Sequence, residues 1–170
     1  LSPDSGVKII YVDGLPFKDF IGDGVLRPYE DWRLSPQERA RDLASRLSVE
    51  EIAGLMLYSP QNHLDDSELT EGQREFLLHD NVRHILVSRV ASPKVAAEWN
   101  NRVQALVEGR THGIPANNSS DPRHLATPDA EFAAGASGKR SLWSNLLGLA
   151  ATFDPEQVEE FGRIAAREYR

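Results

Sequence analysis

Two short apolar runs near the start of the chain flank an Asp-Gly pair. The runs cover residues 7–12 and 15–21, and Asp13 and Gly14 lie between them. Aspartate and glycine both tolerate positive φ, so this pair between two apolar runs is typical of a tight β-hairpin turn. We therefore expect an N-terminal hairpin, closed by the glycine-rich residues 22–24.

Farther along, one pattern that is typical of helix N-termini recurs. A serine, threonine or aspartate is followed by proline at the first helical position, or by glutamate or glutamine at the third. The side-chain oxygen of the first residue can accept a hydrogen bond from backbone N–H groups that lack a partner inside the helix. The pattern predicts five helices, which begin after Ser35, Ser48, Thr70, Ser92 and Asp154.

Two of these helices are predicted to be amphipathic. In each, apolar residues recur every three or four positions and charged residues fall between them, so one face is expected to pack against a core. The apolar positions are Val95, Trp99, Val103, Leu106 and Val107 in the helix after Ser92, and Val158, Phe161, Ile164 and Ala165 in the last helix.

Short apolar runs alternate with the helices and are candidate strands. They cover residues 54–58, 84–87 and 114–117, and they begin about thirty residues apart. An eight-unit β/α barrel of about 250 residues uses roughly 31 residues per unit. The spacing is therefore compatible with consecutive barrel units, although any βαβ fold would give a similar one. Residues 146–151 are a further candidate strand.

Composition narrows the classes of partner. The chain has 170 residues, a net charge of -7 and a sequence pI near 5.2, and an acidic surface repels both nucleic acid and anionic lipid. A neutral substrate such as a sugar suits this charge. The absence of cysteine excludes disulfides and thiol catalysis, and the histidine spacing does not favour zinc. We therefore expect no nucleic-acid or membrane partner, no cofactor and no metal.

Three segments of the chain resemble glycoside hydrolase family 3. Residues 42–56, Asp-Leu-Ala-Ser-Arg-Leu-Ser-Val-Glu-Glu-Ile-Ala-Gly-Leu-Met, are similar to the opening helix and first strand of that family's barrel. The second segment is Gly-Ile-Pro at 113–115 with Ser-Asp-Pro-Arg-His at 120–124, and the third covers residues 142–168. The order and separation of the three make the match specific, and it extends over residues 35–170.

The resemblance implies an α/β fold, namely the N-terminal portion of a TIM-like (β/α)8 barrel with its first three or four βα units. It divides the chain into an N-terminal extension with the hairpin, residues 1–34, and the first part of the barrel domain, residues 35–170. A complete barrel needs about 250 residues. We therefore expect the chain to be part of a longer polypeptide, whose remainder would cover its open strand edges and apolar helix faces.

The resemblance also suggests a sugar-binding site. In that family an aspartate after the Gly-Ile-Pro strand binds hydroxyls of the sugar in the first subsite, and the matching residue is Asp121. A carboxylate can accept charge-assisted hydrogen bonds from two adjacent hydroxyls. Arg123 and His124 would line the same pocket, and Trp143 would stack on a sugar ring. The alternatives are that Asp121 caps a turn or helix, that Arg123 and His124 lie at the outer edge of the loop or Arg123 pairs with a carboxylate, and that Trp143 belongs to the core.

The function implied for the complete protein is that of a retaining, exo-acting β-glycosidase of the β-glucosidase or β-xylosidase type. Its substrates would be β-linked oligosaccharides or aryl glycosides, whose O-glycosyl bonds it would hydrolyse. The family's nucleophile and acid/base are expected beyond residue 170, so this chain alone should be inactive. A non-catalytic carbohydrate-binding α/β fragment and an unrelated small α/β domain are the alternatives. The chain begins at Leu1 and not at Met, so we expect that a leader was removed or trimmed. The expected location is periplasmic or secreted, with a cytoplasmic location as the alternative.

Overall fold

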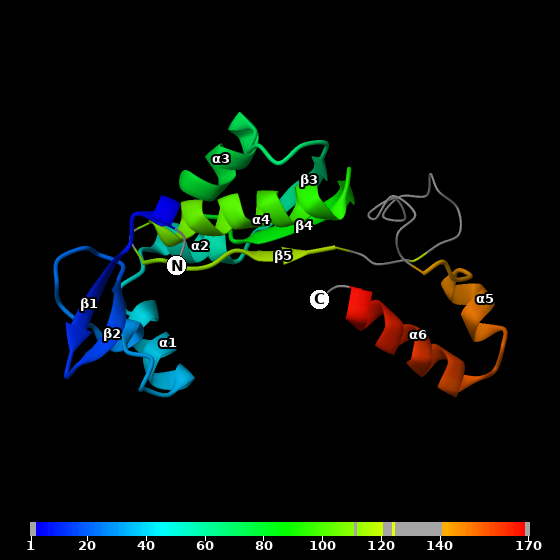
Figure 1. Ribbon diagram of the computed structural model, residues 1–170, viewed down its shortest axis with the longest axis horizontal. Helices are drawn as coiled ribbons and strands as arrows, with labels where there is room; N and C mark the ends of the chain where they lie inside the picture. The colour runs from blue at the N-terminus through cyan, green and yellow to red at the C-terminus, as the bar shows by residue number, and fades with distance from the viewer. Residues whose placement is uncertain (1–2, 111, 121–123, 125–140, 169–170) are drawn as a thin grey trace. The chain divides into compact units, whose positions relative to one another are not determined.

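The computed structural model describes residues 3–110, 112–120, 124 and 141–168, which form a mixed α and β structure (Figure 1). The chain divides into two compact units, each built from several stretches of sequence. The first unit consists of Leu1–Ser59, Glu68–Ile85 and Trp99–Asn118, and the second of Pro60–Ser67, Leu86–Glu98 and Ser119–Arg170.

The expected N-terminal hairpin is confirmed. Strand β1 (Lys8–Val12) pairs antiparallel with β2 (Leu15–Asp19), and both residues of the Asp-Gly turn have positive φ, 54° and 78°. Asp19 is buried at the end of β2, and its carboxylate accepts hydrogen bonds from the backbone N–H groups of Gly22 at 2.7 Å and Gly24 at 2.9 Å. The glycine-rich turn after the hairpin is therefore organised around one buried carboxylate. Short 3-10 turns precede and follow the hairpin, η1 (Pro3–Ser5) and η2 (Pro28–Glu30).

The five predicted helix starts are confirmed. At each one the side-chain oxygen of the cap residue accepts a hydrogen bond from the backbone N–H of the third helical residue. Such a bond satisfies one of the N–H groups that the helix cannot pair itself. The five helices are α1 (Pro36–Ala44), α2 (Val49–Leu55), α3 (Glu71–Leu78), α4 (Pro93–Glu108) and α6 (Pro155–Glu168).

The strands are displaced from two of the apolar runs that predicted them. Strand β4 (His84–Val90) begins where it was expected, but β3 (Tyr58–Leu64) begins only at the last residue of the run 54–58. The helix that Ser48 caps continues through Leu55, so the first residues of that run are helical. Strand β5 (Asn117–Ser119) likewise begins at the end of the run 114–117.

The candidate fourth strand was wrong. Leu146–Ala150 form a short helix, α5, which begins after Asn145. The side chain of Asn145 accepts a hydrogen bond from the backbone N–H of Gly148 at 2.8 Å and so caps the helix. A short apolar run alone does not distinguish a strand from a helix, and here the capping residue decides between them.

Strands β3, β4 and β5 form one sheet in that order. Backbone hydrogen bonds join the starts of neighbouring strands, Asn117 N–H to Arg83 C=O at 2.7 Å, and their ends, Ala91 N–H to Leu64 C=O at 2.8 Å. The strands are therefore parallel, and α3 and α4 provide the crossovers that parallel pairing requires. Within the described ranges the sheet does not close into a barrel, and the partial barrel stays a prediction.

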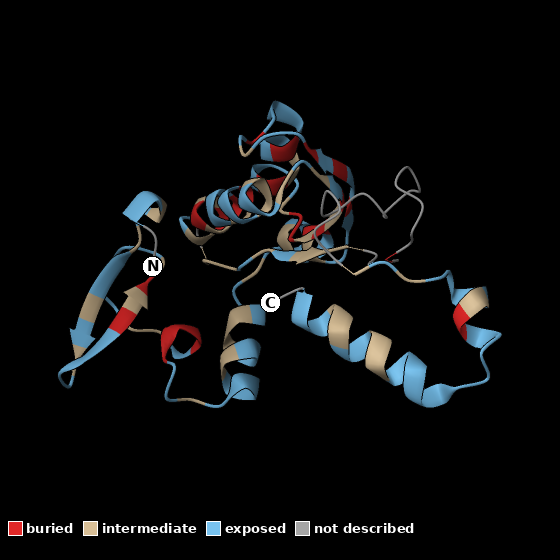
Figure 2. Cartoon of the chain, turned by 45° about the vertical axis from the view of Figure 1, so that its right-hand side comes forward, coloured by how far each residue is buried: buried red, intermediate tan, exposed pale blue. Residues whose placement is uncertain are grey.

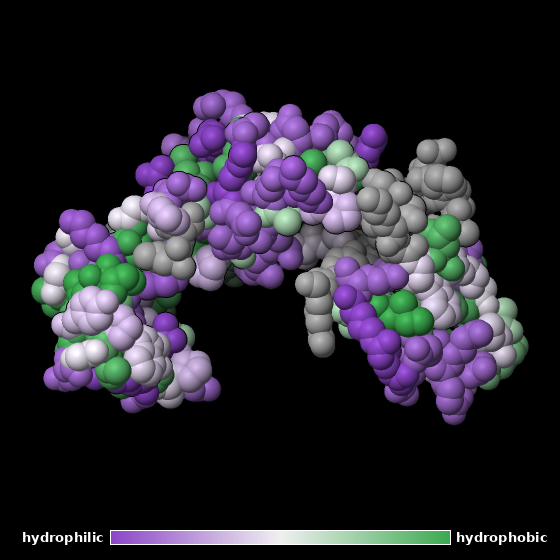
Figure 3. Space-filling view, in the orientation of Figure 1, coloured by the Kyte–Doolittle hydropathy of each residue, from purple (hydrophilic) through white to green (hydrophobic). Residues whose placement is uncertain are grey.

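The predicted apolar face of α4 contributes to the core of the first unit. Trp99, Val103 and Val107 are buried there together with Leu77 of α3 and Ile85 of β4 (Figure 2). The corresponding face of α6 is only half-buried at Phe161, Ile164 and Ala165, and no residue described in α6 is fully buried. Apolar side chains stand at the surface of α5 and α6 (Figure 3). The most exposed of them are Leu146 at 74%, Leu147 at 81% and Phe153, just before α6, at 92%.

Candidate functional site

The carboxylate of Glu168, at the end of α6, holds the chain on both sides of residues 125–140. Its Oε2 lies 2.7 Å from Nε2 of His124, which immediately precedes that segment. On the other side, the backbone N–H of Ser141 donates to Oε1 at 2.7 Å and the Ser141 hydroxyl donates to Oε2 at 3.1 Å. All three residues belong to the second unit. One side chain therefore joins two positions that lie seventeen residues apart in sequence.

Further contacts strengthen the same junction. The backbone N–H of Trp143 donates to the carbonyl of His124 at 2.7 Å, and the Trp143 indole N–H donates to the Ser141 hydroxyl at 2.9 Å. The ring of Phe161 packs edge-on against His124, with centroids 5.6 Å apart, and against Trp143, with centroids 5.3 Å apart. Phe161 lies two helical turns before Glu168, so both side chains project from one face of α6. We call His124, Ser141, Trp143, Phe161 and Glu168 the α6 junction.

His124 is the most constrained residue of the α6 junction. It is completely buried, and its φ of 50° lies in the left-handed region, which few residues other than glycine adopt. Such a conformation persists only when surrounding contacts impose it. Here the backbone carbonyl is bonded to Trp143 and the ring to Glu168, so both the backbone and the side chain of His124 are held.

The charge of Glu168 depends on its partners. A carboxylate in the last turn of a helix is unfavourable, because the C-terminal end of the helix dipole is negative. Burial would raise the pKa of Glu168, but the bonds from Ser141 N–H, His124 and the Ser141 hydroxyl together lower it below its ordinary value. Glu168 is thus ionised at neutral pH, and the α6 junction is built around a negative charge.

The structure brings together two of the four residues predicted to bind sugar. His124 and Trp143 both lie in the α6 junction, where His124 is enclosed and Trp143 is half-buried against Phe161. Asp121 and Arg123 lie outside the described residues. The sugar-binding roles of all four stay predictions.

Sequence reasoning assigned no role to Glu168. A signal was present in the sequence. A negative charge at the C-terminal end of a helix is unfavourable next to the negative end of the helix dipole, so it indicates that another group stabilises the carboxylate. The partners themselves could not be read from spacing, since His124 lies 44 residues earlier in the chain.

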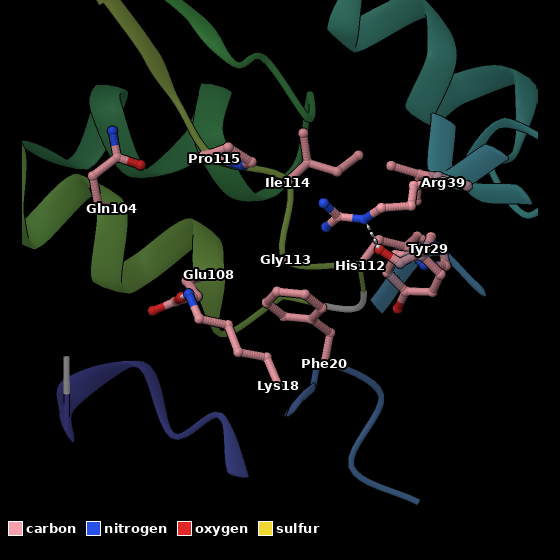
Figure 4. Close-up of a pocket in the computed structure, with 11 residues that line it drawn as sticks. Lys18, Phe20, Tyr29, Arg39, Gln104, Glu108, His112, Gly113, Ile114 and Pro115 are labelled. Carbon is pink, nitrogen blue, oxygen red and sulfur yellow. Dashed lines mark hydrogen bonds and ion pairs between the residues drawn. The ribbon is translucent and has the colours of Figure 1, made fainter. Parts of the chain in front are cut away.

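A separate hollow of about 320 Å³ lies in the first unit, beside residues 112–115 (Figure 4). Lys18 and Glu108 form an ion pair on one side of it. The ring of Phe20 lies so close to Gly113 that a Cβ there would come within 2.0 Å of it, and Gly113 also has a φ of 59°. Glycine is therefore required at this position for two reasons.

This hollow does not have the character of the predicted sugar site. It adjoins the residues that precede β5, and in β/α barrels the active site is built at the opposite, carboxyl ends of the strands. Its wall is partly held by internal contacts, such as the hydrogen bond from Arg39 Nε to the backbone carbonyl of Tyr29 at 3.1 Å. Burial raises the pKa of the Tyr29 hydroxyl, which keeps that group neutral.

The described residues contain neither a metal-binding cluster nor a membrane-spanning helix. Across residues 3–110, 112–120, 124 and 141–168, no three histidine, aspartate or glutamate side chains gather in a way that could hold a metal ion. In the same part of the chain, no helix combines the length and the apolar character that crossing a membrane would require.

Comparison with known proteins relates the chain to glycosidases. It is 37% identical over 172 residues to the periplasmic beta-glucosidase/beta-xylosidase of Dickeya chrysanthemi, an alignment that covers 97% of this chain and 26% of that protein. It is 33% identical over 144 residues to beta-glucosidase C of Emericella nidulans, covering 83% of this chain and 23% of the relative. Probable beta-glucosidase C of Aspergillus oryzae is 32% identical over 148 residues, with the same two shares.

No protein-family model matches the chain. The chain spans about a quarter of the length of the curated relatives that it matches, and the matches cover most or nearly all of the chain itself. From this similarity to three β-glucosidases, together with the three sequence segments, the chain belongs to glycoside hydrolase family 3.

Proposed function

We propose that the chain is the N-terminal part of the barrel domain of a longer, retaining and exo-acting β-glycosidase. The observation that carries this proposal is the 37% identity, over 97% of the chain, to a protein named as a β-glucosidase and β-xylosidase. The parallel order β3, β4, β5 is what consecutive barrel units would give. The substrates would be β-linked oligosaccharides or aryl glycosides of glucose or xylose.

In this proposal the chain binds the sugar and the rest of the polypeptide performs the chemistry. Retaining hydrolysis needs two carboxyl groups about 5–5.5 Å apart that flank the scissile bond, and we place both of them beyond residue 170. The partner of the chain is thus the remainder of its own polypeptide. The exposed apolar residues of α5 and α6 would be covered by that remainder, since exposed patches of this kind usually mark an interface.

Asp121 is proposed as the residue that binds sugar hydroxyls. It follows the end of β5 at Ser119 by two residues, and residues directly after a barrel strand belong to the catalytic face. Arg123 would line the same pocket and Trp143 would face the sugar ring. The name of the bacterial relative includes "periplasmic", which supports a periplasmic or secreted location for this protein as well.

The test uses the intact polypeptide and an aryl β-glucoside or β-xyloside as substrate. Asp121→Ala should lower kcat/KM by about 10²–10⁴-fold, because two hydrogen bonds to a charged group, each of about 1.5–3 kcal/mol, would be lost. Asp129→Asn, a carboxylate nearby in sequence that matches no family motif, serves as the control and should retain wild-type kinetics. Wild-type kinetics in a folded Asp121→Ala protein would overturn the assignment.

A further inference from the structure

We propose that Glu168 is a positioning residue, which holds His124 and Ser141 together and thereby supports sugar binding by Asp121. The consequence for catalysis rests on the proposed function, since it assumes that Asp121 binds sugar. We call the contacts of Glu168 with His124 and Ser141 the clamp. The clamp involves only described residues of the second unit.

The carboxylate of Glu168 uses both of its oxygens to bind residues on the two sides of residues 125–140. Oε1 accepts the backbone N–H of Ser141, and Oε2 is shared by the Ser141 hydroxyl and Nε2 of His124. Charge-assisted hydrogen bonds of this kind are shorter and stronger than neutral ones. The backbone bond between Trp143 and His124 closes the same junction, and Glu168 links both residues of the clamp, His124 and Ser141, to the end of α6.

His124 lies three residues after Asp121 in the sequence. It is buried in a left-handed conformation that its contacts must maintain. Releasing its ring from Glu168 therefore removes one of the constraints that hold the chain at His124, close in sequence to the residue proposed to bind sugar.

Glu168 acts through hydrogen bonding and not through packing. The side chain of Glu168 is 26% exposed, and no described residue of α6 is buried, so its contribution is polar and not that of a core residue. Glutamine can still accept the Ser141 N–H and can donate to the imidazole if the other tautomer forms. Leucine can do neither. Glutamate, glutamine and leucine have similar helix propensities, so either exchange leaves α6 itself intact.

The experiment compares Glu168→Leu, Glu168→Gln and Ser141→Ala with wild type in the intact polypeptide. The first readout is the rate of tryptic cleavage after Arg123, Lys139 and Arg140 under native conditions, followed by mass spectrometry of the peptides. We expect cleavage at these sites to rise about tenfold in Glu168→Leu, to rise less in Ser141→Ala, and to return close to wild type in Glu168→Gln.

The second readout is steady-state kinetics with the aryl glycoside. We expect KM to rise about five- to tenfold in Glu168→Leu, with a smaller change in kcat, and Glu168→Gln to restore most of the loss. Glu159→Leu is the matched control, because it removes an exposed carboxylate from the same helix, whose ion pair with Arg163 lies at the surface. It should leave both readouts unchanged.

Each outcome decides the proposal. Tryptic cleavage equal to wild type in a folded Glu168→Leu protein overturns the clamp, whatever the kinetics. Raised cleavage with unchanged KM overturns the link between the clamp and sugar binding. Should Glu168→Leu fail to fold, unchanged cleavage and kinetics in folded Ser141→Ala overturn the proposal in its place. Failure of the proposed function is seen separately, as wild-type activity in Asp121→Ala.

Discussion

The indole N–H of Trp99 donates a hydrogen bond to Oε1 of Gln73 at 3.2 Å, and both side chains are buried. The same oxygen accepts the backbone N–H of Thr70 at 2.9 Å, and Thr70 in turn caps α3. Gln73 thus completes the N-terminal cap of α3 and also accepts the indole hydrogen bond of Trp99, the largest buried side chain of α4. The two helices lie side by side (Figure 1), and Gln73 and Trp99 both belong to the first unit.

Gln73→Leu should lower the free energy of unfolding by about 1–3 kcal/mol, because it removes a cap and leaves a buried indole N–H without its acceptor. Gln73→Glu keeps an acceptor oxygen and should cost less. Denaturant titration of the intact polypeptide measures both. Gln37→Leu, at an exposed position of α1, is the control and should stay within about 0.5 kcal/mol of wild type. Equal losses at positions 37 and 73 would contradict the role given to Gln73.

The parts of the fold that the sequence predicted are those fixed by neighbouring residues. Ser35 and Glu38 bond to each other's backbone N–H groups across a separation of three residues, and the Asp-Gly turn sets the hairpin by its own φ angles. Family membership was also predicted, from residues that lie in order along the chain, and it excludes the unrelated small α/β domain.

The parts that were missed depend on residues far apart in sequence. Whether residues 54–55 are helix or strand depends on what α2 packs against, and Gly54 lies against Asp80. Glu168 acquires its role only when the fold places its carboxylate beside His124. Neither contact leaves a periodic signal, because periodicity reports which face is buried and not which partner covers it.

Gly54→Ala should destabilise the protein, although alanine usually stabilises a helix relative to glycine by about 0.5–1 kcal/mol. A Cβ at this position would lie 2.1 Å from the backbone oxygen of Asp80, which cannot move away cheaply. The side chain of Asn81 also ties this stretch to α2, through a hydrogen bond to the carbonyl of Glu51 at 2.8 Å. We expect a loss of about 1–3 kcal/mol in the free energy of unfolding.

Gly162→Ala is the matched control for Gly54→Ala. Gly162 is also helical, in α6, and a Cβ there would meet no atom within 4 Å. This variant should raise the midpoint of thermal unfolding of its own region slightly, in keeping with the usual gain of about 0.5–1 kcal/mol. Stabilisation by both alanines would mean that the close approach at Gly54 is absent in solution.

Arg83→Met should cost about 2–4 kcal/mol of the free energy of unfolding, because a buried charged donor is lost and its acceptors stay buried. The guanidinium of Arg83 donates to the carbonyls of Leu77 at 2.8 Å, Val82 at 3.0 Å and Ile114 at 3.1 Å. Burial lowers the pKa of Arg83 to about 10, so the group remains charged at neutral pH.

Lysine offers a second, graded test at position 83. Its single ammonium lacks the planar fork that spans several acceptors, so Arg83→Lys should recover only part of the stability. Arg74→Met, on the exposed side of α3, is the control and should change the free energy of unfolding by less than about 0.5 kcal/mol. Full recovery by lysine would show that charge alone matters, and not the three carbonyl contacts.

Asp42→Asn should lower stability at neutral pH but not in acid. The Asp42 carboxylate accepts two hydrogen bonds from Arg46, at 2.8 and 2.9 Å, and one from the backbone N–H of Tyr29 at 3.2 Å. The bonds from Arg46 lower the pKa of Asp42 below its ordinary value, against burial, which raises it. We expect a loss of about 1 kcal/mol at pH 7, since the pair is partly exposed.

The sign of the pH dependence follows from that lowered pKa. As pH falls, the unfolded state takes up the Asp42 proton first, near the ordinary value of about 3.9, whereas the folded state takes it up at lower pH. The stabilisation is therefore complete above about pH 5 and is lost as pH falls through the folded pKa. Denaturant titrations from pH 7 down to about pH 3 should show the difference in the free energy of unfolding between wild type and Asp42→Asn shrinking steadily.

Asp65→Asn is the control, at an exposed aspartate outside this network. Its free energy of unfolding should stay within about 0.5 kcal/mol of wild type at every pH. A difference at Asp42 that is constant with pH would mean that its bonds to Arg46 do not depend on ionisation.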